Sequence, residues 1–589
     1  MSRKKRQRKR RQPNPQQQSF SPSVDVEGKL QQAISLYQAG QLLQAEQICQ
    51  QILRDYPQDA EALHMLGVIA YQVGESKIAT GLISQAIEID SNQYVFFNSL
   101  GAALQKQGSL EESIQAYQQA IQIQSGDADS YSNLGVALQE QGSLEESIQA
   151  YQQAIQIQPN HPEAYNNLGV VLKEQGRLEE SIQAYQKSIE IQPKSAEAYH
   201  NLGNVLREQG SLEESIEAYQ QAIQIQPDYA EAYSNLGNVL REQGSLEESI
   251  EAYQQAIQIQ PGSAETHNNL GLILLLLGDF HQGWKEYEWR LKCSNFSSEN
   301  RNFPQPYWNG IHLNGKSVLI WAEQGIGDEI MFTSILPNLS QMTEKIISEC
   351  DQRLTPLFQR SFPQIQFFSR ANPPHPRLLD KNIDYQMPIG GLGQWFRTNE
   401  KSFLSGQDSY LHACPKKVLQ MKRKYQQLAD GKLLVGISWK STGINQRRAS
   451  LKSTVLKDWT FILSGKNCFF MSLQYGDVKA EINTFTNQTE IPIYQDKEID
   501  SFQSLDDFAA QVAALDLVIS IDNSTVHVAG ALGKPVWTLL PFTPDWRWML
   551  NRSDSPWYPS MTLFRQKEIG DWDGVFQQIK LELMQYTKN

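Results

Sequence analysis

The sequence predicts a multidomain protein in which an all-α repeat solenoid precedes an α/β region made of two parallel-sheet halves. Three observations support this prediction. A glycine recurs every 34 residues through the first half of the chain. Beyond residue 312, short apolar segments alternate with amphipathic ones, a pattern typical of parallel α/β sheets. Finally, a chain of 589 residues is too long for one hydrophobic core.

The recurring residues of the first half share one period. Within each period a tyrosine follows the glycine by 16 residues, small residues follow it by 12 and 19, and proline closes several periods. This pattern resembles the tetratricopeptide repeat and covers residues 26–297, about eight repeats, with a linker at 298–312. The glycines are Gly67, Gly101, Gly135, Gly169, Gly203, Gly237 and Gly271.

Each recurring residue has a mechanical explanation. Glycine and the small residues let the two helices of a repeat pack closely, and proline ends the repeat because it cannot continue a helix. The recurring "SLEE" predicts a capping box at the start of each second helix, in which serine and glutamate satisfy free backbone amides. The expected pairs are Ser109 with Glu112, Ser143 with Glu146, Ser211 with Glu214, and Ser245 with Glu248.

A row of asparagines stands two residues before the repeat glycines. An asparagine amide both donates and accepts hydrogen bonds, so such a row can hold the backbone of an extended peptide whatever its sequence. In this feature the chain resembles the protein O-linked N-acetylglucosamine transferases, which implies a polypeptide partner on the concave face. The alternative is that recent duplication copied soluble residues. The row comprises Asn133, Asn167, Asn201, Asn235 and Asn269.

The second half predicts two Rossmann-like halves at 313–414 and 415–589, with a cleft between them. One larger sheet is the alternative. Before them, the aromatic segment with Trp284, Tyr287 and Trp289 predicts a capping helix that docks onto a partner surface, which the sequence does not identify. The expected strands are 317–322, 345–350, 365–369 and 384–388, then 433–439, 468–474, 490–495, 515–522 and 534–541.

A first candidate motif is "EQGIGDE", with Gly325, Gly327 and Asp328 between a strand and a helix. It is neither a dinucleotide-binding fingerprint nor a P-loop. Asp328 would lie at the carboxyl edge of a parallel strand, where such sheets bind ligands. Its carboxylate can take a proton from an attacking hydroxyl, although capping the helix is the simpler role.

Two further motifs predict an anion site. In "SIDNSTVH", a strand ends directly before a helix whose amides and hydroxyls suit phosphate oxygens, while the histidine is equally explained as a helix residue. In "SWKSTGINQRRASLK", a cationic loop follows another strand and suits a diphosphate leaving group, with a solvated surface loop as the alternative. The residues are Asp522, Asn523, Ser524, Thr525 and His527 in the first motif, and Lys440, Arg447, Arg448 and Lys452 in the second.

Together with "ALGKPVW" and the following "PDWRWML", these motifs resemble glycosyltransferase family 9, the heptosyltransferases. The resemblance covers residues 313–589. It implies a GT-B-like double Rossmann domain, a nucleotide-diphosphate sugar as donor substrate, and neither a cofactor nor a catalytic metal. It assigns the general base to Asp328, a basic donor-side residue to Lys440, and the donor-phosphate loop to residues 522–527. Trp546, Trp548, Trp557 and Tyr558 are expected either to stack on sugar or nucleobase or to lock the domain core.

Charge and composition limit the other classes of function. The tail at residues 1–25 holds eight of the chain's 52 Lys and Arg residues, against 65 Asp and Glu in all, so the body is acidic and no specific nucleic-acid binding is expected. The tail itself is either disordered or touches nucleic acid or anionic lipid. No apolar run is long enough for a transmembrane segment, and five dispersed cysteines favour a cytoplasmic location.

The sequence therefore predicts a glycosyltransferase that moves a sugar from a nucleotide-diphosphate sugar to a polypeptide held by the solenoid. The alternative is a non-catalytic tetratricopeptide adaptor with a degenerate glycosyltransferase-like domain. A nucleic-acid- or membrane-associated scaffold is a third reading and depends on the basic tail alone.

Overall fold

The computed structural model describes residues 24–294, 296, 301–403, 409–441 and 446–588. The basic tail therefore lies outside the described residues. The chain divides into two compact units, Met1–Gln209 and Gly210–Asn589. The first holds repeat helices, and the second holds further repeat helices together with the α/β region, which confirms the predicted fold class.

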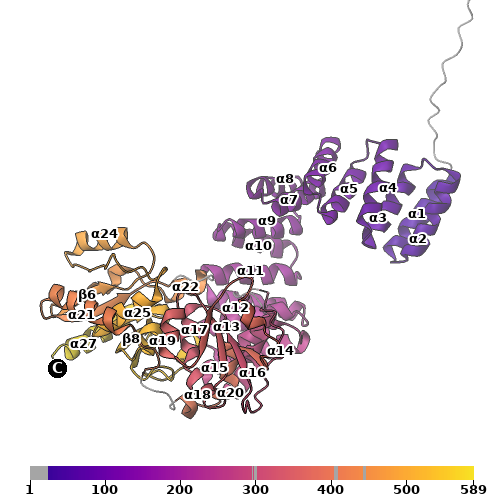
Figure 1. Ribbon diagram of the computed structural model, residues 1–589. Coiled ribbons are helices and arrows are strands. Elements are labelled where there is room, and N and C mark those ends of the chain that lie inside the picture. The colour runs from indigo at the N-terminus through magenta and orange to yellow at the C-terminus, as the bar shows by residue number, and fades with distance from the viewer. Residues whose placement is uncertain (1–23, 295, 297–300, 404–408, 442–445, 589) are drawn as a thin grey trace, which may run out of the picture. The chain divides into compact units, whose positions relative to one another are not determined.

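The first unit consists of helices joined by short turns, and successive helices lie side by side (Figure 1). Their bounds are α1 (Val24–Gln38), α2 (Leu42–Asp55), α3 (Ala60–Gln72), α4 (Ser76–Ile89), α5 (Tyr94–Gln107), α6 (Leu110–Ile123), α7 (Ala128–Gln141), α8 (Leu144–Ile157), α9 (Pro162–Glu174), α10 (Leu178–Ile191) and α11 (Ala196–Gln209).

The repeat glycines create room for the recurring tyrosines. A methyl group added to Gly101 would lie 2.7 Å from the ring of Tyr117, and Gly135 stands in the same relation to Tyr151. The small residue 12 positions after the glycine adds a bond, because the Ser113 hydroxyl donates to the Gly101 carbonyl oxygen at 2.8 Å. The predicted reason for the glycine period, close packing of paired helices, is confirmed.

The predicted capping boxes do not form. Ser109, Ser143 and Ser245 are N-cap residues, yet none of these side chains makes a capping hydrogen bond in the described structure. The reason is the turn before them: Gly108 is left-handed (φ 88°), and the Ser109 amide bonds back to the Leu104 carbonyl. This closure of the preceding helix sets ψ of Ser109 to 69°, short of the extended value that a capping hydroxyl requires.

The second unit begins with further repeat helices, α12 (Leu212–Ile225), α13 (Ala230–Gln243), α14 (Leu246–Ile259), α15 (Ala264–Leu277), α16 (Phe280–Tyr287) and η1 (Glu288–Lys292). The aromatic end of this segment docks as predicted, and the surface it docks on is the α/β region. Trp284 and Tyr287 are buried, and the Trp284 indole donates to the Arg397 carbonyl oxygen at 2.7 Å. The compact unit that contains this docking begins at Gly210, well before the predicted end of the repeats at residue 297.

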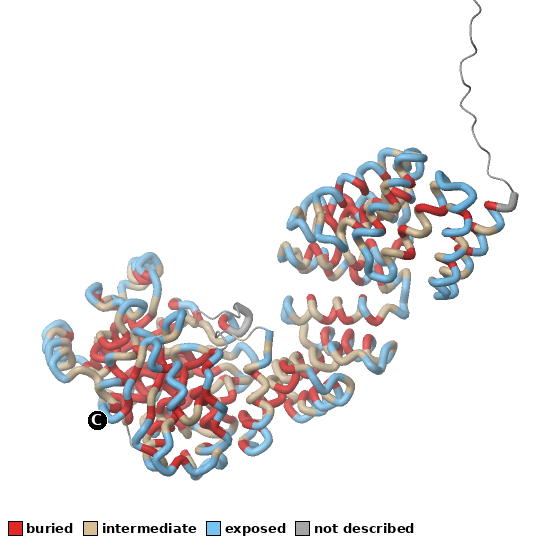
Figure 2. The backbone as a smooth tube through the Cα atoms, turned by 45° about the vertical axis from the view of Figure 1, so that its right-hand side comes forward, coloured by how far each residue is buried: buried red, intermediate tan, exposed pale blue. Residues whose placement is uncertain are grey.

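The α/β region contains two parallel sheets, as predicted. The first has the order β3-β2-β1-β4 and the second β6-β5-β7-β8-β9. Figure 2 shows buried residues concentrated along these strands. The strands are β1 (Val318–Trp321), β2 (Ile346–Cys350), β3 (Gln366–Ser369), β4 (Tyr385–Pro388), β5 (Leu433–Ser438), β6 (Cys468–Ser472), β7 (Leu517–Ile521), β8 (Val536–Leu540) and β9 (Met561–Arg565).

One strand prediction for the second sheet is wrong, and one strand of that sheet was not predicted. Residues 490–495 contribute only an isolated bridge, between Tyr494 and Met471, because Pro492 lacks the N–H that a ladder needs. The fifth strand is instead Met561–Arg565, which the sequence reading did not treat as a strand.

Helices connect and cover the strands (Figure 1). In the part of the chain that the structure describes, no helix is long and apolar enough to cross a membrane. The helices are α17 (Ile326–Thr333), α18 (Leu336–Ser340), α19 (Thr355–Ser361), η2 (Pro376–Leu379), η3 (Ile389–Leu392), α20 (Gly393–Phe396), η4 (Glu400–Phe403), α21 (Pro415–Ala429), α22 (Gln446–Lys452), η5 (Leu456–Trp459), α23 (Thr460–Leu463), α24 (Lys479–Thr489), α25 (Leu505–Ala514), α26 (Ser524–Ala531), η6 (Trp546–Trp548) and α27 (Trp572–Tyr586).

The last repeat glycine yields a stability prediction. A methyl group on Gly271 would lie 2.6 Å from the Tyr287 amide nitrogen and 3.0 Å from the Gly283 carbonyl oxygen, so no side-chain rotation relieves the clash. We expect Gly271→Ala to destabilise this unit by about 2 kcal/mol, because overpacking outweighs the better helix propensity of alanine. The matched control is Gly262→Ala, where the added methyl meets open space. Thermal unfolding checks this: equal melting temperatures for the two variants would contradict it.

Candidate functional site

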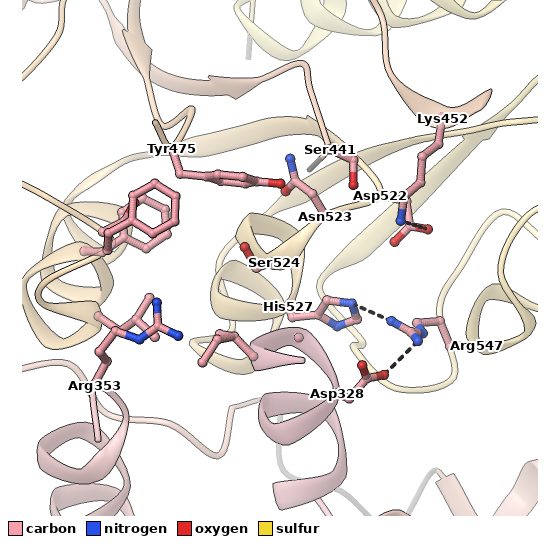
Figure 3. Close-up of a pocket in the computed structure, with 16 residues that line it drawn as sticks. Asp328, Arg353, Ser441, Lys452, Tyr475, Asp522, Asn523, Ser524, His527 and Arg547 are labelled. Atoms are coloured by element: carbon pink, nitrogen blue, oxygen red, sulfur yellow. Dashed lines mark hydrogen bonds and ion pairs between the residues drawn. The ribbon is translucent and has the colours of Figure 1, made fainter. Parts of the chain in front are cut away.

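A cavity of about 360 Å³ lies between the two sheet halves, at the carboxyl ends of their strands. From the first half come the start of α17 and Arg353. From the second come Ser441 after β5, Tyr475 after β6, and the turn after β7. Figure 3 shows Asp328 and Arg353 on one side of this space and Ser441, Tyr475 and Asn523 on the other. The predicted cleft therefore exists, in the size range of small-molecule sites.

Asp328 lies in this cavity, on the first turn of α17. Its side chain is 15% exposed, and one carboxylate oxygen accepts a hydrogen bond from Arg547 Nη2 at 2.8 Å. The other oxygen accepts from the Gly325 amide at 3.3 Å, so Asp328 also caps its helix. Burial raises the pKa of Asp328, and the guanidinium of Arg547 opposes that rise. A carboxylate with a raised pKa is a stronger base than one in water.

The two motif glycines have different roles. A methyl group on Gly327 would lie 2.8 Å from Cδ2 of His527, so only glycine lets α17 approach α26 this closely. Gly327 lines the cavity. Gly325 forms the turn from β1 into α17 and is not among the described residues that line the cavity.

A hydrogen-bonded chain leads from the cavity into the core. His527 Nε2 lies 3.3 Å from Arg547 Nη1, and His527 Nδ1 lies 2.8 Å from the Tyr558 hydroxyl. Burial, with the charges of Arg547 and Lys452, lowers the pKa of His527 well below its usual range. The imidazole is therefore neutral. Because arginine only donates, Nε2 accepts and Nδ1 carries the proton. His527 thus orients Arg547 toward Asp328.

The turn after β7 divides the predicted phosphate loop into structural and cavity-lining residues. Asn523 is an N-cap whose side chain accepts from the Thr525 amide at 2.9 Å and donates to the Ser438 hydroxyl at 2.8 Å. The Thr525 amide is therefore already satisfied, and its side chain is buried outside the cavity lining among the described residues. Asp522, Asn523 and Ser524 line the cavity. Of these three residues, Ser524 alone is partly exposed, and it offers a hydroxyl group.

Lys440 does not take the position expected from the sequence. Its ammonium pairs with Glu481 at 2.7 Å, and it is not among the described residues lining the cavity. The reason lies in the backbone, since the amide and carbonyl of Lys440 bond to the side chains of Gln474 and Asn523. Among the described residues of this segment, Lys452 is the cation that lines the cavity, and its ammonium lies 3.3 Å from Asp522. Arg447 and Arg448 fall in α22, but their side chains lie outside the described part of the structure.

The aromatic cluster is core. Trp546, Trp548, Trp557 and Tyr558 are all at most 6% exposed, and Trp546 meets Trp284 edge-on with ring centroids 5.4 Å apart. Of the two roles the sequence left open for these rings, the structure supports the locking of the domain core. Arg547, between two of these tryptophans, was missed as a site residue. Its only sequence signal was a charged residue inside an aromatic run. Arg353 and Tyr475 had no recognisable signal.

Asparagines of the row hydrogen-bond to other asparagines of the same unit, either on the helix of a neighbouring repeat or on their own helix. In the first unit, Asn201 Nδ2 donates to the Asn166 amide oxygen at 3.2 Å. In the second, Asn269 Nδ2 donates to Asn238 at 3.2 Å, and Asn238 Nδ2 donates to Asn235 at 3.4 Å. Asn133 is exposed and Asn167 half-buried. Each of these bonds uses only part of the hydrogen-bonding capacity of the amide that makes it.

The helical repeats and the α/β halves define the class of this molecule: tetratricopeptide repeats followed by a C-terminal region of two parallel sheets. The family models described as "TPR repeat" and "Tetratricopeptide repeat" match the repeat half. The second matches residues 30–94, and the first matches residues 104–142, 137–176, 171–206, 203–244 and 237–278. Repeats of this kind present a surface for protein or peptide partners.

Among characterised proteins, the chain is similar to Protein FlbA of Caulobacter vibrioides, with 31% identity over 297 residues. This match covers 48% of the present chain and 49% of FlbA, so the chain spans about half the length of the curated relative. Similar solved structures include the Cut9-Hcn1 assembly of APC/C, with 18% identity, a TM-score of 0.36, and coverage of 41% and 48% of the two chains. Another is YrrB, titled a TPR protein with an unusual peptide-binding site, with 21% identity, a TM-score of 0.28, and coverage of 31% and 95%.

Proposed function

We propose that the protein is a glycosyltransferase that moves a sugar from a nucleotide-diphosphate sugar to a polypeptide bound by its repeats. The observation that carries this proposal is the cavity between the sheet halves, in which a buried carboxylate faces cationic side chains. Glycosyl transfer requires both parts: a base for the acceptor hydroxyl and positive charge for the departing diphosphate.

Asp328 is the proposed general base. It reaches the cavity from the first half, its pKa is raised by burial, and it is held by Arg547. Arg547 in turn is oriented by His527 and paired with Asp545 at 3.1 Å. A base fixed in this way keeps its reactive oxygen in one orientation, which lowers the entropic cost of proton transfer. In the reaction, the acceptor oxygen bonds to the sugar carbon, its proton passes to Asp328, and the diphosphate leaves with the bonding electron pair.

The cationic side chains that line the cavity are the proposed diphosphate contacts. They are Lys452 and Arg547 from the second sheet half and Arg353 from the first, each with a carboxylate neighbour. The Lys452–Asp522 distance of 3.3 Å is long for a charged hydrogen bond, so the ammonium can turn to a phosphate oxygen at little cost. The Ser524 hydroxyl, at the N-terminus of α26, adds a donor where the helix dipole favours negative charge.

The acceptor is proposed to be a polypeptide because the repeats occupy nearly half of the chain and carry amide side chains in a row. An amide row recognises main-chain groups and tolerates varied sequences. The alternative, a non-catalytic adaptor with a degenerate glycosyltransferase-like domain, would bind partners on the same surface. The two functions differ in whether the cavity binds a nucleotide-diphosphate sugar and supports transfer.

The test is calorimetric titration of the full chain with a panel of nucleoside diphosphates. We expect one of them to bind, and Lys452→Ala to weaken that binding about tenfold through loss of a charge-assisted hydrogen bond. The matched variant is Lys440→Ala, whose ammonium pairs with Glu481 instead, and its affinity should stay within about twofold.

The nucleotide that binds then names the donor for a transfer assay, in which sugar on polypeptide is detected by mass spectrometry. Absence of binding by the folded chain across the panel would refute the transferase proposal and leave the adaptor reading. If Lys440→Ala weakens nucleotide binding and Lys452→Ala does not, the phosphate contact is made by Lys440, the residue that the sequence indicated.

A further inference from the structure

A second cavity of about 360 Å³ lies in the second unit, beside the first. One wall is made of repeat helices, with Arg241 on α13 and Leu276 on α15. The other wall is the segment after β8, including Phe542 and Trp546. Lys452 and Asp522 line both cavities, so the two spaces share a wall.

The repeat wall continues the asparagine row. Asn269, Leu272 and Leu276 follow one another at i, i+3 and i+7 on α15, which places them on one face of the helix. Leu272 and Leu276 line the second cavity, and Asn269 lies one turn before them. The face that carries the last asparagine of the row therefore changes from amide to apolar where it reaches the cavity.

The cavity leaves large apolar side chains open to solvent. Leu451, Phe542 and Ile569 line it and are 46%, 36% and 54% exposed. They come from three separate segments, so their gathering at one cavity is a product of the fold. Charged groups of both signs lie on the same rim, including Arg241 and Asp545.

We propose that this second cavity is an acceptor subsite that takes a large apolar side chain of the polypeptide next to the hydroxyl that receives the sugar. The inference rests on the proposed function, which supplies the reaction in the first cavity. Its own support is the shared wall, the apolar lining and the amide row that leads into it. A lipid chain would need a uniformly apolar channel, whereas this cavity joins apolar side chains to amides and to charges of both signs.

The shared wall also sets the spacing of the two recognised groups. An extended peptide advances about 3.3 Å per residue, so groups in adjoining cavities belong to residues a few positions apart. The acceptor motif is therefore a Ser or Thr with Leu, Ile, Val or Phe within about three residues.

The experiment uses two pools of fluorescent 13-residue peptides with a central serine and anisotropy titration of the full chain. One pool carries Leu, Ile, Val or Phe within three residues of the serine, and the other carries Asn, Gln or Gly there. We expect the apolar pool to bind about tenfold more tightly, the change expected for burying one such side chain. Phe542→Ala with Ile569→Asn should reduce the preference to less than twofold.

The matched control is Phe461→Ala with Ile311→Asn, since Phe461 and Ile311 are 58% and 46% exposed and line neither cavity. This control should keep the tenfold preference. Equal binding of the two pools would overturn the inference, as would a preference that survives the paired change at Phe542 and Ile569. Binding of a fluorescent dodecanoate, lost in that same variant and without any peptide preference, would overturn it in favour of a lipid occupant.

Nucleoside diphosphate binding, measured on the same samples, keeps the two proposals apart. If the nucleotide binds and the peptide preference is missing, only the subsite inference fails. If the preference is present and no nucleotide binds, the transferase proposal fails, and the subsite inference falls with it as an acceptor site.

Discussion

Asp328→Asn is expected to reduce sugar transfer by about 10²- to 10⁴-fold, the usual contribution of a positioned general base. The amide keeps the shape of the side chain and its contact with Arg547, but it cannot take the proton of the acceptor hydroxyl. The loss should appear in the rate of transfer at saturating donor, while the affinity for the nucleoside diphosphate changes by no more than a few-fold. Transfer measured by mass spectrometry and binding measured by calorimetry separate these two effects.

The neighbouring Glu329→Gln is the matched control. Glu329 lies on the same helix turn but faces away from the cavity lining, accepting from the Asp351 amide at 2.9 Å. Burial raises the pKa of Glu329 to about 8 and the Arg370 guanidinium opposes that rise, while glutamine keeps the acceptor oxygen that the Asp351 amide uses. We expect transfer by Glu329→Gln to stay within a few-fold of the native rate. Equal activity of the native protein and Asp328→Asn would remove Asp328 from the proposed mechanism.

Glu323→Gln is expected to lower the free energy of unfolding of the second unit by about 3 kcal/mol. Glu323 is fully buried and forms a two-point ion pair with Arg290, at 2.9 Å to Nε and 2.5 Å to Nη2. Its carboxylate also accepts from the Gly390 amide at 2.9 Å, so one side chain ties the end of the repeats to the first sheet half. Neutralising it leaves a guanidinium buried without its principal counter-charge, which is the costly change in such pairs.

Its control is Glu288→Gln, because Glu288 also bonds to Arg290, at 2.7 Å, but its side chain is 29% exposed. A partly solvated pair contributes little, so this loss should stay below about 1 kcal/mol. Denaturant unfolding followed by tryptophan fluorescence checks both values, because all 12 tryptophans of the chain lie in the second unit. Equal losses for the two variants would mean that the Arg290–Glu323 pair does not hold the repeats to the sheet.

The sequence alone determined the repeats, the two-sheet organisation and the motifs that form the cavity. A 34-residue period of glycine and tyrosine has one structural cause, close packing of paired helices, so it could be read without coordinates. Parallel strands place their carboxyl ends at one edge of a sheet. This rule predicted that Asp328 shares a cavity with Asp522 and Ser524, which lie almost 200 positions later in the chain. Local rules of this kind depend on neighbours in the chain.

The tertiary structure alone decided which polar side chains reach that cavity. Lys440 and Lys452 belong to the same cationic segment, yet one pairs with Glu481 and the other faces Asp522. Arg547 meets Asp328 across 219 positions. The prediction of capping serines was wrong for a similar reason, because the turn before each serine sets its backbone conformation. Side-chain partners and the second, apolar cavity depend on how distant segments pack, and packing contacts between such segments leave no periodic trace in the sequence.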